Sequence, residues 1–136
     1  MEAISKPLPR VTPELAPFFA AAKARQLVVQ RCAGCGLLRF PPRELCNRCW
    51  SRDAEWVPVS GRGEVFSFYW MHQVYHPGFA TEVPYAVVTV ALDEGPHVLT
   101  NVIGCTRDTL RVGLPVEVTF EDASDTVTLP KFRPRG

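Results

Sequence analysis

Four of the five cysteines in the sequence form two pairs with the spacing of metal ligands. Two residues separate Cys32 from Cys35, and two separate Cys46 from Cys49. Thiolates at this spacing sit on one tight turn, and two such turns facing each other can surround a single tetrahedral ion. Four protein ligands leave no open position for a substrate, so the pattern predicts a structural ion. Zinc is the expected ion, and iron, which accepts the same four thiolates, is the alternative.

The surroundings of these pairs favour metal over disulfides. The first ten residues contain no apolar run, so we expect no secretion signal and a cytoplasmic protein, in which paired cysteines bind metal more often than they oxidise. The longest stretch without a charged side chain, residues 65–81, contains His72 and Pro77, which argues against a membrane span. We expect Trp50, directly after the second pair, to pack over the metal site.

The remaining candidates for chemistry are three histidines and the unpaired Cys105. His72, His76 and His97 could act as general bases, but no acidic residue lies nearby in a pattern that would orient them. Cys105 is interpreted as a small buried side chain in preference to a nucleophile. The sequence therefore predicts no catalytic residue in this chain.

Short elements must position the cysteines, because 9 glycines and 13 prolines interrupt the chain. One helix is expected near the start, where Thr12 is a candidate N-cap, although Pro17 favours a regular helix that begins only there. Strands are expected on both sides of the first cysteine pair, at 27–30 and 37–40, and after the second pair at 55–59.

The second half of the chain has the pattern of a small β-barrel. Its expected strands cover residues 64–72, 84–92, 97–103, 114–120 and 126–129. We expect Phe66, Phe68 and Trp70 on one face of the first strand, and 84–92 buried on both faces. Five short strands in this length favour an OB-type barrel. The prediction is a mainly β protein with an N-terminal helical segment (1–25), a zinc ribbon (26–60) and a five-stranded OB-fold barrel (61–136).

Exposed aromatic residues are the expected contacts with a partner protein. Phe18 and Phe19 are adjacent and cannot both face one narrow helix stripe, so one of them is available to a partner. Tyr75 and Phe79 lie on a long loop of the barrel, where they either contact a partner or close the barrel mouth. Five arginines of the ribbon could meet phosphates or acidic side chains, or could form an ordinary solvated face: Arg31, Arg39, Arg43, Arg48 and Arg52.

The charge balance weighs against nucleic acid as the main partner. Residues 1–60 carry 9 basic and 5 acidic side chains, residues 61–136 carry 6 and 9, and the net charge is +1. Nucleic-acid binders usually have a larger basic excess. A single-stranded nucleic-acid-binding protein remains the alternative function, because zinc ribbons and OB barrels both bind such strands.

The ordered motifs resemble those of the DUF35 family over almost the whole chain. They are residues 30–36 with the first cysteine pair, Pro41-Pro42-Arg43, the second pair, residues 60–65, Pro84-Tyr85, residues 92–95, Gly113 and residues 129–132. The resemblance implies a rubredoxin-like zinc ribbon followed by an OB-fold.

The same resemblance implies a function. Family members are accessory subunits of thiolase-superfamily enzymes, among them thiolases and lipid-transfer-protein-like aldolases of steroid side-chain degradation. Some are joined to a MaoC-type hydratase domain, and we expect no hydratase segment within these 136 residues. We therefore expect a non-catalytic subunit that binds and stabilises a thiolase-fold enzyme and helps to form its acyl-CoA site.

Overall fold

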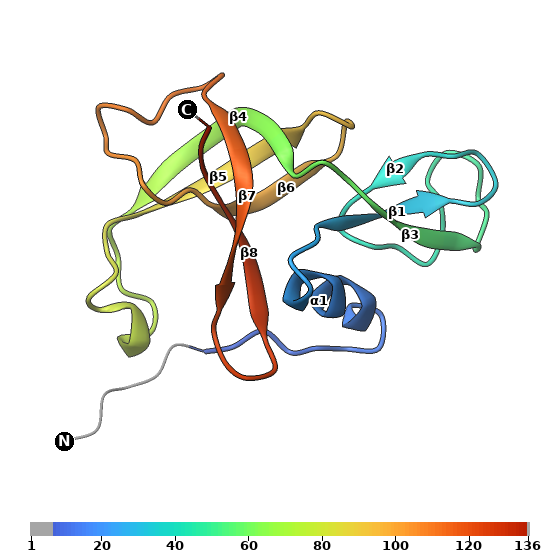
Figure 1. The fold of residues 1–136 in the computed structure, drawn as a ribbon, viewed down its shortest axis with the longest axis horizontal. Coiled ribbons are helices and arrows are strands. Elements are labelled where there is room, and N and C mark those ends of the chain that lie inside the picture. Colours follow the sequence, from blue (N-terminus) through green and yellow to red (C-terminus); the bar gives the residue numbers. More distant parts are fainter. Residues whose placement is uncertain (1–6, 136) are drawn as a thin grey trace.

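The chain folds into a three-stranded sheet and a five-stranded sheet, with one helix packed between them (Figure 1). A computed structural model describes residues 7–135. The small sheet contains β1 (Val28–Cys32), β2 (Leu38–Arg39) and β3 (Ala54–Pro58) in the order β2-β1-β3. The large sheet contains β4 (Arg62–Met71), β5 (Tyr85–Leu92), β6 (His97–Asn101), β7 (Pro115–Asp122) and β8 (Thr128–Pro134). No helix within these residues is long and apolar enough to cross a membrane.

Helix α1 (Ala16–Lys23) begins one residue before the predicted position. Thr12 precedes it as the start of a tight turn, in which its carbonyl accepts the N–H groups of Leu15 and Ala16. Pro17 therefore falls in the first helical turn, where its missing N–H has no helical partner to lose. After the helix, Arg25 adopts a positive φ of 64° and turns the chain toward β1.

The large sheet closes on itself into a barrel. Its strand order is β6-β5-β4-β7-β8, and every neighbouring pair is antiparallel. The edge strands meet at a parallel bridge between Val102 and Phe132, where the Ile103 N–H donates to the Phe132 carbonyl at 2.8 Å. The hydroxyl of Thr100 adds a hydrogen bond to the Pro130 carbonyl at 3.3 Å. A nearly closed antiparallel barrel of five strands is the predicted OB architecture.

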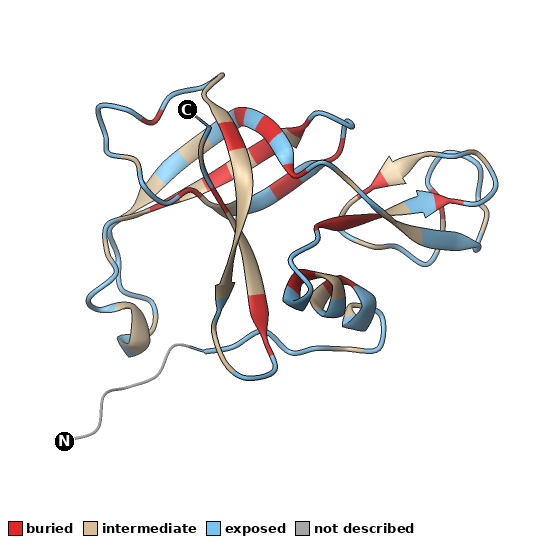
Figure 2. Cartoon of the chain, viewed as in Figure 1, coloured by how far each residue is buried: buried red, intermediate tan, exposed pale blue. Residues whose placement is uncertain are grey.

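The interior of the barrel is built from alternating residues, which corrects two predictions (Figure 2). Strand β5 is buried on one face only, since Ala86, Val88, Val90 and Leu92 point inward and the residues between them are half-buried. In β4 the pairing shifts between Val65 and Ser67, so Phe66 is the extra residue of a bulge. Phe66 consequently points outward, 57% exposed, whereas Phe68 and Trp70 pack against the core, so the three do not share one face as predicted.

The helix and the ribbon share one aromatic cluster. Phe18 is 7% exposed, and its ring lies 5.0 Å from that of Phe40 and 6.3 Å from that of Trp56. Phe19 packs edge-on against Phe18 at 5.3 Å and is half-buried. Since Phe40 and Trp56 belong to the chain around the small sheet, Phe18 joins the helix to the ribbon.

Candidate metal centre

The structure brings Cys32, Cys35, Cys46 and Cys49 into one cluster, in which all four sulfur atoms lie within 4.8 Å of one another. The Sγ atoms of Cys32 and Cys49 are 3.5 Å apart, and those of Cys35 and Cys46 are 3.7 Å apart. Four sulfurs about 2.3 Å from a tetrahedral zinc would be about 3.8 Å from each other. The cluster therefore has the ligand type, number and spacing of a structural zinc site.

The two cysteine turns share one backbone pattern. Cys32 N–H donates to the Leu37 carbonyl, and Cys46 N–H donates to the Ser51 carbonyl, both at 2.9 Å. Each pattern joins the first cysteine of a pair to the residue five positions later. Strand β1 ends at Cys32, so the sheet fixes the first turn, and the hydrogen bonds to Ser51 and from Trp50 close the second.

The electrostatics of the cluster call for a cation. The N–H of Cys35 points at the Cys32 sulfur and lowers the pKa of Cys32 to about 6, and the N–H of Arg48 lowers the pKa of Cys46. The N–H of Ser51 also favours a lower pKa at Cys49. Contacts of the Cys49 thiol with the other cysteines, first of all Cys32, together with burial, outweigh this effect and raise the pKa of Cys49 to about 12. Four thiolates this close cannot all be charged at neutral pH unless a positive ion lies among them.

The arginines of the ribbon do not form one phosphate-binding face. Arg31 pairs with Glu55 at 2.5 Å across the sheet. Arg39 is buried, and its guanidinium donates to the Gln30 side chain at 2.8 Å and to the Arg43 carbonyl at 3.0 Å. The Arg39 contacts tie the segment between the cysteine pairs to the sheet, whereas the Arg31–Glu55 pair joins β1 to β3 at the surface.

The exposure of Trp50 corrects the expectation that this side chain packs over the metal site. Its side chain is 73% exposed, and its φ is +67°. A positive φ is uncommon for a residue other than glycine. The sequence contains a signal for this exposure, because Trp50 follows Cys49 as Gly36 follows Cys35.

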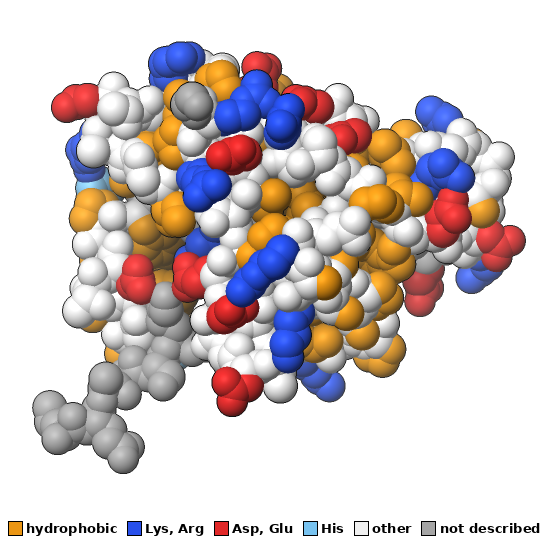
Figure 3. Space-filling model, in the orientation of Figure 1, with side chains coloured by type: hydrophobic (Ala, Val, Ile, Leu, Met, Phe, Trp, Pro, Cys, Tyr) orange, Lys and Arg blue, Asp and Glu red, His pale blue; other side chains and the backbone are white. Residues whose placement is uncertain are grey.

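The expected partner contacts differ strongly in exposure. Phe18 is buried in the aromatic cluster of the helix, so of the adjacent pair only Phe19 keeps surface that a partner can reach. Tyr75 is 74% exposed. Phe79 is half-buried in the short helix η1 (Pro77–Phe79), with its ring 5.8 Å from that of Tyr85. Figure 3 shows hydrophobic surface concentrated over α1 and where the zinc ribbon joins the rest of the molecule.

The histidines and Cys105 have contacts typical of structural residues. His72 contacts Arg107, His76 accepts the N–H of Gly78 at 2.9 Å, and the His97 ring stacks on Phe66 at 4.5 Å. The Cys105 thiol lies 3.6 Å from the Val102 carbonyl, and burial raises its pKa. A thiol with a raised pKa is a weak nucleophile at neutral pH.

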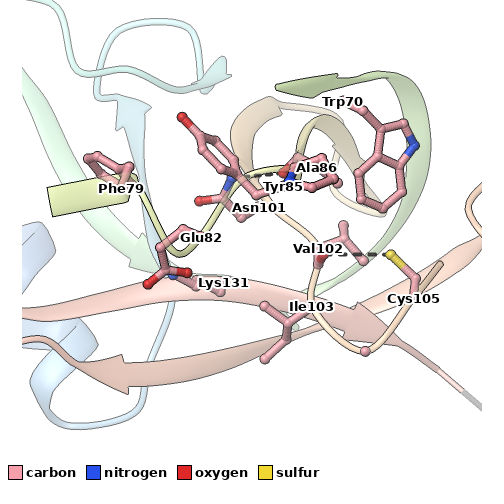
Figure 4. A pocket seen from close by; sticks show the side chains of 12 residues that line it. Trp70, Phe79, Glu82, Tyr85, Ala86, Asn101, Val102, Ile103, Cys105 and Lys131 are labelled. Carbon is pink, nitrogen blue, oxygen red and sulfur yellow. Dashed lines mark hydrogen bonds between the residues drawn. The ribbon is translucent and has the colours of Figure 1, made fainter. Parts of the chain in front are cut away.

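A cavity of about 280 Å³ opens at the end of the barrel beside the loop after β4. Figure 4 shows Trp70 and Cys105 at one end and Glu82 and Lys131 close together at the other. Ligand pockets usually measure about 300–1,000 Å³, so this cavity lies close to the lower end of that range. Sequence reasoning missed it because barrel closure alone brings β6 and β8 together around it.

Comparisons with known proteins decide the family. Residues 19–55 match the model described as "ChsH2, rubredoxin-like zinc ribbon domain", and residues 56–121 match "ChsH2, C-terminal OB-fold domain". The chain belongs to the ChsH2 (DUF35) family. As a ChsH2-type chain it contains the rubredoxin-like ribbon in which the four cysteines form a structural metal site.

One solved structure resembles this ChsH2-type chain over nearly its full length. It is titled "Ltp2-ChsH2(DUF35) aldolase", and the matched chain is 42% identical with a TM-score of 0.84. The match covers 93% of this chain and 98% of that chain.

Three relatives by sequence are named as an enzyme subunit or as a scaffold protein. A probable enoyl-CoA hydratase alpha subunit of Thermomonospora curvata is 42% identical over 95% of this chain, which spans 40% of that protein. A DUF35 domain-containing scaffold protein of Methanocaldococcus jannaschii is 31% identical over 79% of this chain and 81% of its own length. A benzoylsuccinyl-CoA thiolase subunit, BbsA, of Geobacter metallireducens is 40% identical over 66% of this chain and 58% of its own length.

Proposed function

We propose that this chain is a non-catalytic subunit that binds and stabilises a thiolase-superfamily enzyme acting on acyl-CoA. The observation that carries the proposal is the likeness to the DUF35 chain of an Ltp2 aldolase complex, which extends over 98% of that chain. The names of a thiolase subunit and of a scaffold protein among the relatives point in the same direction.

The contacts of the chemically capable side chains support a non-catalytic role. His72, His76 and His97 are held by an arginine, a backbone N–H and a phenyl ring. None of these contacts is to an acid that would orient the imidazole for proton transfer. The catalytic residues would then belong to the partner enzyme. If that partner is an aldolase of the steroid type, the reaction would be the retro-aldol cleavage of a steroid side chain that is carried as its acyl-CoA.

The cavity at the barrel end supports a contribution to the partner's acyl-CoA site. Its walls include Trp70 and Ile103, and its far end is lined by Glu82 and Lys131 (Figure 4). A small cavity that opens at the end of the barrel is suited to a site that a second protein completes. This contribution concerns substrate placement, not bond cleavage.

Co-purification and kinetics test the proposal. Tagged chain is mixed with the Ltp2 subunit of the solved aldolase complex, and we expect a stable complex in which the aldolase melts at a higher temperature than it does alone. Alanine variants of His72, His76, His97 and Cys105 should leave kcat of the assembled complex within about tenfold of wild type. A loss of more than about a hundredfold in kcat, with assembly intact, would place acid–base chemistry in this chain and contradict the non-catalytic role.

A further inference from the structure

The second cysteine turn places a tryptophan at the position where the first has a glycine. Gly36 and Trp50 each donate their N–H to the carbonyl of the first cysteine of their pair, at 2.9 Å in both turns. Their φ values are +78° and +67°, so the backbone has the same left-handed form at both positions. Glycine adopts this form without strain, whereas a residue with a side chain does not.

Packing within the chain does not compensate for this strain. The Trp50 side chain is 73% exposed, and none of the aromatic ring pairs found within residues 7–135 includes it. The other tryptophans, Trp56 and Trp70, pack against the hydrophobic core. Trp50 thus displays a large apolar surface at a position where local backbone energetics favour no side chain at all.

Arg48 and Arg52, both exposed, stand two positions before and two positions after this tryptophan in the sequence. The guanidinium of Arg48 donates to the Cys35 carbonyl at 2.9 Å, which holds it against the cysteine turns. Arg52 is exposed, and neither arginine is in an ion pair with another residue of the described chain. We refer to Arg48, Trp50 and Arg52 as the knuckle patch. A metal-bound turn holds such a patch in place, so little ordering is needed when it binds.

We propose that the knuckle patch is a docking contact for a protein surface that offers an apolar pocket bordered by carboxylates. Tryptophan and arginine are the side chains most enriched among the few that dominate interface energies. The positive flanks select an acidic border by charge complementarity. This inference rests on the proposed function, because we assign the pocket to the thiolase-superfamily partner.

The observations favour a protein over a nucleic acid as the occupant. A strand-binding surface needs several cations along a groove, whereas Arg31 is paired with Glu55 and Arg39 is buried. The net charge of the chain is only +1. A protein interface, by contrast, commonly takes most of its binding energy from a few tryptophan, tyrosine and arginine side chains.

The decisive variant is Trp50→Gly, because it should change stability and binding in opposite directions. Glycine relieves the strained backbone, so we expect the free, zinc-loaded chain to melt at the same or a higher temperature. Its Kd for the Ltp2 subunit of the solved aldolase complex should rise at least about 30-fold. Arg52→Glu should raise Kd as well, and more at low than at high salt. Val112→Ala, which truncates a side chain that is 63% exposed on the barrel, is the matched control and should bind as wild type does.

Each other result overturns a defined step. If Trp50→Gly binds Ltp2 within about threefold of wild type, the knuckle patch is not a docking contact. If the free variant melts lower, Trp50 stabilises the turn itself and the argument from strain is wrong. If wild type does not bind Ltp2 at all, the proposed function fails together with the partner assignment. If wild type binds a labelled single-stranded oligonucleotide tightly at physiological salt and Trp50→Gly abolishes this, the patch serves nucleic acid instead.

Discussion

Replacing Phe18 by alanine should strongly destabilise the free chain. The Phe18 ring is 7% exposed and lies 5.0, 5.3 and 6.3 Å from the rings of Phe40, Phe19 and Trp56. Truncation of a buried phenylalanine costs about 3–5 kcal/mol. For a chain of this size, about 1 kcal/mol corresponds to roughly 3–5 °C in Tm, so we expect a fall of about 10–20 °C.

Thermal unfolding followed by circular dichroism, with zinc content measured on the same samples, tests this expectation. Phe19→Ala is the matched control, because it removes the same side chain from the neighbouring position, which is half-buried. We expect it to lower Tm by less than half as much as Phe18→Ala does. Partner capture by Phe18→Ala should decline only as the folded fraction declines. If Phe18→Ala melts within about 1 °C of wild type, Phe18 does not join the helix to the ribbon and the magnitude above is wrong.

Three further outcomes follow from named contacts. Cys46→Ser should lose the single equivalent of zinc by elemental analysis, whereas Cys105→Ser should retain it, because only the former removes a sulfur of the four-cysteine cluster. Arg25 donates to the Asp122 carboxylate at 2.7 and 2.9 Å and, with a hydrogen bond from Thr128, lowers the pKa of Asp122 to about 2. The stability contributed by this charged form is present above the ordinary pKa near 4 and is lost as pH falls toward 2. The urea concentration at the midpoint of unfolding should therefore fall less between about pH 4 and pH 2 in Asp122→Asn than in the wild type. Gly61→Ala should destabilise the chain by at least about 2 kcal/mol in urea unfolding, because its Cβ, at φ +78°, would lie 2.3 Å from Val118 Cγ1. Gly113→Ala is the control: at φ +89° its nearest neighbour would be 3.8 Å away, so it should cost only the backbone strain.

Sequence reasoning succeeded where the determining interactions are local. The spacing of Cys32 and Cys35 fixes one turn, and the turn after Leu92 fixes the hairpin of β5 and β6, so both could be predicted from neighbouring residues. The number of strands followed from alternation and turn residues in the same way. A helix start depends on Pro17 and a tight turn at Thr12, and it was predicted to within one residue.

Features that depend on distant pairing could not be predicted from one sequence. The outward position of Phe66 results from a bulge against β5, which alternation within β4 alone does not indicate. Phe18 and Phe19 have the same side chain, and which of them is buried depends on distant residues, among them Phe40 and Trp56. Lys131 and Asn101 are far apart in the sequence and line one cavity only because β8 returns to β6.

The closure of the barrel also has a consequence for hydrogen exchange. In the described residues, β6 and β8 are joined by the bridge at Val102 and Phe132 and by the hydrogen bond from Thr100 to Pro130, whereas every other strand junction of the barrel is a ladder of three or more pairs. The Ile103 amide, which donates across this junction, should therefore exchange with solvent through local opening, well before the amides of β5. Asn101 and Lys131, from the two sides of the junction, border three adjoining hollows. Local opening of the β6–β8 junction would therefore widen all three cavities together, while the central strands keep their pairing.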